Sequence, residues 1–174
     1  ALFRRYYRFG ADRKEIEATI RQHAPDVVAI TSSYTTYSLE ALEAAKIAKK
    51  VSSDIITVMG GTHPTLFPLQ PLQDPYVDYV IRGEGETPLF SLIRALKSDR
   101  RKTAAGIPGV SSRRNGDYSL SGIAIEKDID RIPARELLNS SDYRIGGKNY
   151  AFFLTSRGCP FRCAFCGKPP VPYR

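Results

Sequence analysis

The sequence lacks the features that mark membrane and secreted proteins. Its 174 residues contain no apolar run near the ~20 residues that a membrane-spanning helix needs. The N-terminal stretch ALFRRYYRFGADRKE has neither a continuous apolar core nor a small-residue cleavage site, so no signal peptide is indicated. Three cysteines cannot all pair with one another, which argues against a disulfide framework and for a reducing compartment. We therefore expect a cytoplasmic protein without a membrane span.

Histidine and cysteine are also scarce, which limits the metal sites that the chain can build. Both histidines, His23 and His63, lie far upstream of the cysteines, which are Cys159, Cys163 and Cys166. A structural zinc site wants four ligands, and a ferredoxin-type cluster wants a fourth thiolate. Three thiolates alone suit a 4Fe–4S cluster that leaves one iron open for a substrate or cofactor. The alternatives are a partial zinc site and three unrelated thiols.

Basic residues outnumber acidic ones, which gives a formal net charge of +8 and allows an anionic partner. They are scattered along the chain. Only the segment RRYYRF interleaves them with aromatic residues, as a nucleic-acid surface would require. The pattern predicts a solvated basic surface and disfavours nucleic acid as a partner.

The apolar segments up to residue 104 predict an α/β fold with a parallel sheet. Strands are expected at Val27–Ile30 and within the segments DIITVMGG and VDYVIRGEGE, the first buried on both faces because its run is β-branched. Helices are expected at 12–23, from Ser38 as a possible N-cap to about 53, and at 86–98, where Leu89, Leu92, Ile93 and Leu96 share one face. The proline-rich segment THPTLFPLQPLQDP predicts a loop. Strands that alternate with helices or long connections form a parallel sheet.

The pattern changes after Ala104. Two short strand-like runs flank Asn115-Gly116, a signal for a hairpin turn. The apolar run YAFFL predicts a new strand that leads into the cysteines. We therefore expect an N-terminally incomplete α/β domain at 1–104, a connector with a hairpin at 105–148, and the start of a second domain at 149–174.

The cysteine segment TSRGCPFRCAFCGKPP, with the spacing Cys-x3-Cys-x2-Cys, resembles the cluster motif of radical S-adenosylmethionine enzymes. An aromatic residue, Phe165, precedes the last cysteine, and SRGCP follows an apolar run, as in one branch of that family. The resemblance implies that Cys159, Cys163 and Cys166 ligate a 4Fe–4S cluster, on the loop after the first strand of a partial (β/α) barrel. It also implies that S-adenosylmethionine binds the open iron and is cleaved to a radical, with electrons from a donor such as flavodoxin or ferredoxin.

The order of the glycine-containing turns and the cysteine loop resembles the cobalamin-binding subfamily of these enzymes. That subfamily includes anaerobic magnesium-protoporphyrin monomethyl ester cyclases and methyltransferases, and a Rossmann-like domain holds its corrinoid against the barrel. The loops after parallel strands are where such sheets bind ligands. The resemblance implies cobalamin contacts at three loops: Ser32, Ser33 and Tyr34; Gly60, Gly61, His63 and Pro64; Gly83, Glu84 and Gly85.

The pattern Asp-x-His-x-x-Gly, whose histidine ligates cobalt in many cobalamin proteins, is absent. We therefore expect cobalamin to bind without a histidine of this chain beneath cobalt. His63 is interpreted mainly as a residue that orders its loop. Glu84 and Glu86 are interpreted as turn and helix-start residues rather than a catalytic pair, because acidic side chains suit a helix N-terminus.

The resemblance implies radical methyl transfer or oxidative cyclisation of a small molecule, with a tetrapyrrole as one candidate. Two alternatives stay open. One is a methylthiotransferase-type enzyme that modifies RNA, although such enzymes carry N-terminal cysteines that this chain lacks. The other is a corrinoid- or nucleotide-binding module with a structural metal site. Because the family's barrel continues beyond the cysteines, we expect the 174 residues alone to be inactive, and no catalytic residue is assigned within them.

Overall fold

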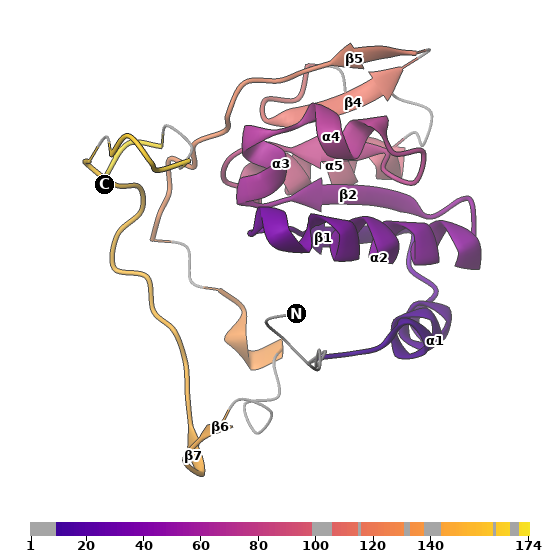
Figure 1. The fold of residues 1–174 in the computed structure, drawn as a ribbon, viewed down its shortest axis with the longest axis horizontal. Helices are drawn as coiled ribbons and strands as arrows, with labels where there is room; N and C mark the ends of the chain where they lie inside the picture. The colour runs from indigo at the N-terminus through magenta and orange to yellow at the C-terminus, as the bar shows by residue number, and fades with distance from the viewer. Residues whose placement is uncertain are drawn as a thin grey trace, which may run out of the picture.

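A five-stranded sheet with helices on both faces forms the centre of the protein (Figure 1). The computed structural model describes residues 10–98, 106–114, 116–130, 133–137, 144–161, 163–167 and 171–174. The strands lie in chain order: β1 (Val27–Thr31), β2 (Ile56–Gly60), β3 (Tyr79–Ile81), β4 (Val110–Arg114) and β5 (Asp117–Ser119). The first three strands are parallel. Strand β4 pairs antiparallel with β3, and β5 pairs antiparallel with β4. The predicted α/β class with a parallel sheet is confirmed.

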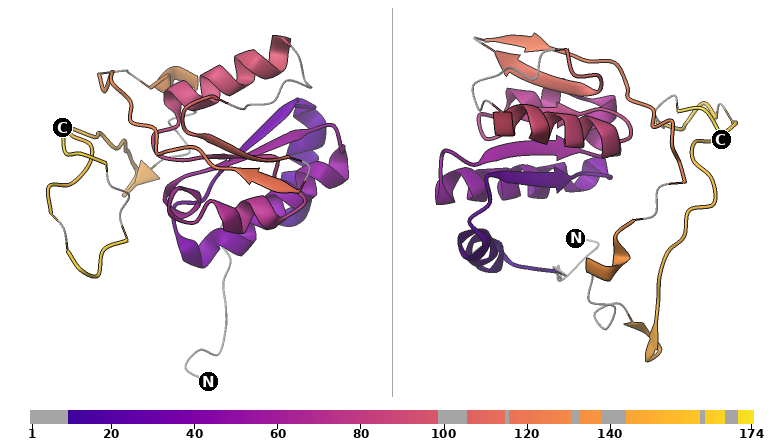
Figure 2. Two further views of the ribbon diagram at one scale, coloured as in Figure 1. Left: turned by 90° about the horizontal axis from the view of Figure 1, so that it is seen from above. Right: turned by 180° about the vertical axis from the view of Figure 1, so that it is seen from behind.

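Two layers of helices cover the sheet. One face carries α2 (Ser38–Val51), α3 (Thr62–Leu66) and α4 (Leu69–Gln73), and the other carries α5 (Glu86–Ser98) (Figure 2). Helix α1 (Arg13–His23) packs against α2. Because neighbouring side chains of a strand point to opposite faces, β2 contributes side chains to the core on both faces of the sheet. Met59 packs with Leu72 on the α4 side, and Val58 packs with Leu92 on the α5 side.

Local sequence signals explain where two of the helices begin. Asp12 caps α1, since its carboxylate accepts hydrogen bonds from the amides of Lys14 and Glu15, at 2.8 and 2.9 Å. Helix α2 follows directly on the 3-10 helix η1 (Thr35–Tyr37), so Tyr37 is its N-cap and Ser38 is its first residue. The prediction that Ser38 caps this helix was therefore wrong.

Three further expectations about the sheet domain were wrong. Pro64 and Pro71 lie in the first turns of α3 and α4, where proline is tolerated, so the proline-rich segment is partly helical rather than a loop. Strand β1 is at the edge of the sheet and is only partly buried, with Ala29 exposed. On α5, Ile93 is 42% exposed and lies off the apolar face that Leu92 and Leu96 form.

The chain after the sheet begins with the predicted hairpin and then has little regular structure. Strands β4 and β5 pair as expected, and because β4 pairs with β3, the sheet extends past residue 104. A 3-10 turn, η2 (Arg135–Leu137), and a small hairpin of β6 (Arg144–Ile145) and β7 (Lys148–Asn149) follow.

The new strand predicted before the cysteines is not formed. Phe152, Phe153 and Leu154 are 74–84% exposed, and no strand in the described part of the chain pairs with them. A strand needs a neighbour to satisfy its backbone hydrogen bonds. Within the described ranges, no helix is both long and apolar enough to cross a membrane.

Candidate functional site at the carboxyl ends of the parallel strands

The three predicted cobalamin loops meet at one edge of the sheet, because the strands that precede them are parallel. The amide of Ser32, after β1, donates to the carbonyl of Gly60 at 2.8 Å, and the amide of His63 donates to the carbonyl of Ser32 at 3.0 Å. The amide of Gly83, after β3, donates to the hydroxyl of Thr65 at 2.9 Å. These bonds join the first loop to the second and the second to the third.

Two of the predicted glycines are required by the backbone itself. Gly61 and Gly83 have φ angles of +102° and +90°, which other residues rarely adopt. A Cβ atom on Gly61 would lie 2.8 Å from the carbonyl oxygen of Ser32, and one on Gly83 would lie 2.1 Å from that of Ala124. Both glycines therefore let neighbouring segments approach each other closely.

His63 and Thr65 are buried residues of the second loop, and their contacts fix its conformation. His63 is 3% exposed, its Nδ1 lies 3.2 Å from the hydroxyl of Thr35, and its ring packs against Phe67. Burial lowers the pKa of His63, because the charged imidazolium would lose its hydration. The Thr65 hydroxyl donates to the Gly61 carbonyl at 2.7 Å. These contacts favour the loop-ordering interpretation of His63.

An apolar hollow opens beside the loops, on the face of the sheet that α5 covers. It measures about 510 Å³ and reaches from β1 to α5, with walls that include Ala29, Val58, Ile81, Leu89 and the loop glycines Gly60, Gly61, Gly83 and Gly85. The edge strand leaves this face open. Concave, mostly apolar sites with few polar groups are typical of cofactor binding.

The other predicted loop residues differ in burial. Ser32 is 3% exposed, and its hydroxyl has no hydrogen-bond partner among the described residues. Ser33 is exposed, as is Tyr34, whose ring makes an edge contact with Tyr37, and Pro64 is buried inside α3. A buried hydroxyl without a partner costs free energy. A bound group that supplies a partner to Ser32 would remove that cost, so the loops fit a cofactor that carries polar groups.

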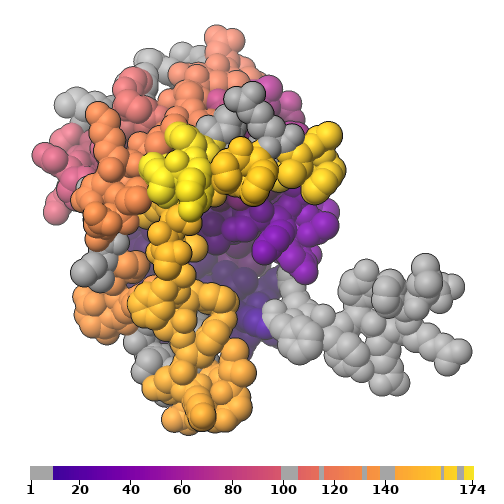
Figure 3. All heavy atoms as spheres, turned by 90° about the vertical axis from the view of Figure 1, so that its left-hand side faces the viewer, coloured from indigo at the N-terminus to yellow at the C-terminus, as the bar shows by residue number. Residues whose placement is uncertain are grey.

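The cysteines lie on a closed loop that rests on this same edge of the sheet. We call residues 157–174 the cysteine loop; its described residues are 157–161, 163–167 and 171–174. Cys159 lines a hollow of about 360 Å³ together with Ser33, Gly61, Gly83 and Glu84, one or more residues from each of the three loops. The C-terminal residues lie across this side of the sheet domain (Figure 3).

The three thiols share one loop but are not gathered around a common point. Cys163 and Cys166 are exposed, and the Cys166 amide donates to the Cys163 carbonyl at 3.0 Å in a tight turn. No group of three or more His, Cys, Asp or Glu side chains in the described ranges is arranged to hold a metal ion. The donor chemistry fits an iron–sulfur cluster, and binding one would draw the three thiols together.

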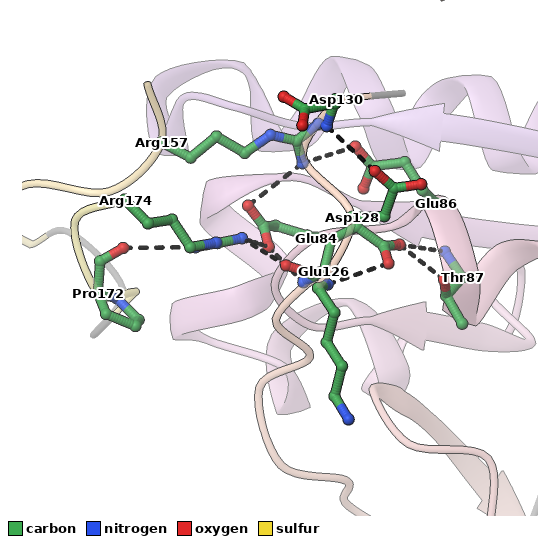
Figure 4. Close-up of polar contacts among 10 residues, drawn as sticks. Glu84, Glu86, Thr87, Glu126, Asp128, Asp130, Arg157, Pro172 and Arg174 are labelled. Atoms are coloured by element: carbon green, nitrogen blue, oxygen red, sulfur yellow. Dashed lines mark hydrogen bonds and ion pairs between the residues drawn. The ribbon is translucent and has the colours of Figure 1, made fainter. Parts of the chain in front are cut away.

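Glu84 points at the cysteine loop rather than away from the protein. Its carboxylate accepts the Glu126 amide at 2.5 Å and pairs with Arg157 at 3.2 Å and with Arg174 (Figure 4). Burial alone would raise the pKa of Glu84, but the Glu126 amide and the two guanidinium groups outweigh it and lower that pKa. Glu84 is therefore held as a carboxylate.

Sequence reasoning missed four residues of this site. Thr65 lies in the proline-rich segment that was expected to be a loop. Arg157 is part of the quoted SRGCP motif, but no role was given to it. Nothing in the sequence pattern indicated Glu126 or Arg174, because both reach Glu84 across long chain separations.

The sequence of the sheet domain matches known proteins. The B12-binding domain family matches residues 5–93, about half of the chain. An uncharacterised methyltransferase of Pyrococcus horikoshii is 36% identical over 156 residues, which cover 87% of this chain and 33% of that protein. The anaerobic magnesium-protoporphyrin IX monomethyl ester cyclase of Cereibacter sphaeroides is 32% identical, over 89% of this chain and 26% of the cyclase. The chain thus spans about a third or less of these relatives.

Two further matches are proteins whose names state a radical reaction. The cobalamin-dependent radical SAM methyltransferase TokK of Streptomyces tokunonensis is 33% identical, over 82% of this chain and 22% of TokK. The structure of the radical S-adenosylmethionine methyltransferase TsrM from Kitasatospora setae, with cobalamin and a [4Fe-4S] cluster bound, matches 63% of this chain and 22% of its own. Its TM-score is 0.55 at 22% identity, a likeness of fold.

Proposed function

Because the chain belongs to the B12-binding domain family, we propose that it holds cobalamin at the three loops that follow β1, β2 and β3. The loops present glycine backbone and the unpartnered hydroxyl of Ser32, and these suit the corrin ring and its amide side chains. The 510 Å³ hollow beside them is mostly apolar and suits the aromatic base of the nucleotide tail. His63 is buried and its Nδ1 lies 3.2 Å from the hydroxyl of Thr35, so we assign it to ordering its loop rather than to ligating cobalt.

We propose further that Cys159, Cys163 and Cys166 hold a 4Fe–4S cluster. With S-adenosylmethionine bound, such a cluster supplies reductive cleavage of the sulfonium and so a 5′-deoxyadenosyl radical. The observation that carries this proposal is the 360 Å³ hollow, which Cys159 lines together with the loops assigned to cobalamin. This chain's part is to bring the two cofactors to one place.

The protein that contains this chain is, on this proposal, a cobalamin-dependent radical S-adenosylmethionine enzyme acting on a small molecule. We propose radical methyl transfer or oxidative cyclisation as its reaction: the Pyrococcus relative is named a methyltransferase, the Streptomyces relative a radical SAM methyltransferase, and the Cereibacter relative a cyclase. A tetrapyrrole is a candidate substrate because of that cyclase. Flavodoxin or ferredoxin is the proposed class of electron donor, and the cytoplasm the proposed compartment.

Anaerobic reconstitution of the protein at its natural length, with iron, sulfide and hydroxocobalamin, tests the proposal. We expect a corrinoid absorption band that stays with the protein through gel filtration, together with a reduced-cluster electron paramagnetic resonance signal that changes when S-adenosylmethionine is added. A cluster signal without corrinoid would favour the RNA-modifying alternative. Zinc in place of iron would contradict the cluster.

A further inference from the structure

The cysteine loop is held at its base by charges from the sheet domain. We infer that Glu84 and Glu86 are positioning residues: they fix this loop against the three loops at the carboxyl ends of the strands. The contacts themselves do not depend on any cofactor. Their consequence, that the cluster is set at a defined place beside cobalamin, rests on the proposed function.

The base of the loop is a short backbone pair. The amide of Arg157 donates to the carbonyl of Arg174 at 2.8 Å, and the amide of Arg174 donates back at 3.0 Å. Gly158 has a φ of +80°, and a Cβ atom there would lie 2.1 Å from the carbonyl oxygen of Pro172. The two ends of the cysteine loop are therefore tightly apposed, and all three cysteines lie between them.

Both arginines of this pair turn their side chains toward the third loop (Figure 4). Arg157 lies 2.7 Å from the carboxylate of Glu86 and 3.2 Å from that of Glu84. Arg174 pairs with the other oxygen of Glu84 and donates to the carbonyl of Glu126 at 2.9 Å. The side chains of Glu84, Arg157 and Arg174 are 12–23% exposed and that of Glu86 is 36% exposed, so the two pairs of Glu84 are not loose surface pairs.

The segment that carries Glu84 and Glu86 is itself held by hydrogen bonds to neighbouring segments. The Glu84 amide donates to the carbonyl of Ala124 at 3.0 Å, and the Ala124 amide donates to the carbonyl of Arg82 at 2.8 Å. The carboxylate of Glu126 accepts the amide and the hydroxyl of Thr87 at the start of α5, at 3.1 and 2.6 Å. The third loop, residues 124–126 and α5 therefore form one unit, and the arginines dock onto it.

Interpreting Glu84 and Glu86 as ordinary turn and helix-start residues explains fewer of their contacts than the positioning role does. An acidic side chain near a helix N-terminus gains only a modest stabilisation from the helix dipole. In α5, however, the free amide of Thr87 is satisfied by Glu126, and the carboxylate of Glu86 is directed to Arg157. The two glutamates thus serve the cysteine loop, which lies about seventy residues further along the chain.

Amide hydrogen exchange on the cofactor-free protein tests this inference directly. The double variant Glu84→Gln/Glu86→Gln keeps side-chain size and removes both charges. We expect exchange at the amides of Arg157 and Arg174 to accelerate about tenfold, while amides of β2 keep their protection. Glu40→Gln, an exposed glutamate in the first turn of α2, is the matched control and should leave all of these rates unchanged.

A second pair of variants changes the two arginines of the cysteine loop and leaves the sheet domain unaltered. Arg157→Gln/Arg174→Gln should accelerate the same amides, whereas Arg157→Lys/Arg174→Lys should restore part of the protection because the charge is kept. Combining Glu84→Gln with Arg157→Gln should have a smaller effect than the sum of the two single changes, because each single change already removes the pair between them. Should the glutamate variant fail to fold, the arginine variants decide the question alone.

The exchange experiment can fail or succeed independently of the proposed function. Unchanged exchange at Arg157 and Arg174 in both charge-removing variants would overturn the positioning role, even in a protein that binds both cofactors. Accelerated exchange in a protein that takes up neither corrinoid nor iron would support the contact and overturn the proposed function instead.

Discussion

The sheet domain and the cysteine loop are held by different kinds of interaction. In the sheet domain, Met59, Leu72 and Leu92 are fully buried between layers of secondary structure. In the cysteine loop, Phe161 and Phe165 are 67% and 92% exposed, and ion pairs and a hydrogen bond join its base to the domain. One half of the candidate site is therefore built by packing, and the other is attached by charge.

This difference predicts that the two halves respond to different changes. Burial of apolar surface contributes most of the stability of a domain, whereas a partly exposed ion pair contributes far less. The cobalamin loops should keep their shape across conditions in which the cysteine loop moves.

The largest expected effect is loss of the cluster with retention of the corrinoid. Changing Cys163→Ala removes one of three thiolates, and we expect iron content and the visible cluster absorbance to fall to near background. Because Cys163 lies outside the three loops and outside the residues that line the 510 Å³ hollow, hydroxocobalamin binding should persist. Ser156→Ala, a neighbouring polar change outside the cysteines, should preserve both cofactors. Loss of corrinoid in the cysteine variant would contradict the separation of the two halves.

The next effect compares two large apolar side chains. Leu92→Ala empties a fully buried position and should lower the free energy of unfolding by about 2–5 kcal/mol. Phe153→Ala removes a side chain that is 77% exposed and should change it by less than about 0.5 kcal/mol. Denaturant titration followed by circular dichroism measures both. A cost above 2 kcal/mol for Phe153→Ala would show that this segment is packed.

A third prediction compares two glycines that share a backbone conformation. Gly83 and Gly106 have φ angles of +90° and +88°, but only Gly83 has close neighbours. Gly106→Ala should cost about 1–2 kcal/mol for the left-handed backbone alone. Gly83→Ala should cost about 1–3 kcal/mol more, because its Cβ would meet the carbonyl of Ala124. Equal melting temperatures for the two variants would contradict the close approach.

The smallest effect concerns pH. Because burial lowers the pKa of His63, the unfolded chain binds the proton more tightly than the folded one. Its contribution to stability is therefore complete above the unfolded pKa of about 6.5 and is lost as the pH falls through the lower folded value. Stability should decline by at most about 1.4 kcal/mol per pH unit in that window.

Replacing the histidine checks this assignment. His63→Gln should flatten the decline in melting temperature below pH 6.5, whereas His23→Gln, at an exposed position at the end of α1, should preserve it. The same slope in wild type and in His63→Gln would show that other groups cause it.

The sequence predicted the framework better than the contacts between distant segments. Val27–Ile30, the two strands after it and the helix at 86–98 were visible because their patterns are local. The family resemblance is confirmed by the match to the B12-binding domain family over residues 5–93. The edge position of β1 was missed because burial depends on the order of strands, which no local pattern encodes.

The candidate site was predicted in part for the same reason. The glycines after each strand were visible, but the pattern does not show that Gly61 meets Ser32 or that Gly83 meets Ala124. Glu84 and Arg157 both lie in quoted motifs, yet their pairing joins positions 73 residues apart. The assignment of the loops to cobalamin and of the three cysteines to a cluster stays a prediction.

The most direct test of the central claim measures whether the two cofactors lie together. The claim is that the sheet domain holds cobalamin and fixes the cysteine loop beside it. Pulsed electron paramagnetic resonance on the reconstituted protein, with cobalt as Co(II) and the cluster reduced, reports their dipolar coupling. The account predicts a strong coupling with one narrow distance distribution, broadened in Glu84→Gln/Glu86→Gln. Two uncoupled signals in the unaltered protein would contradict it.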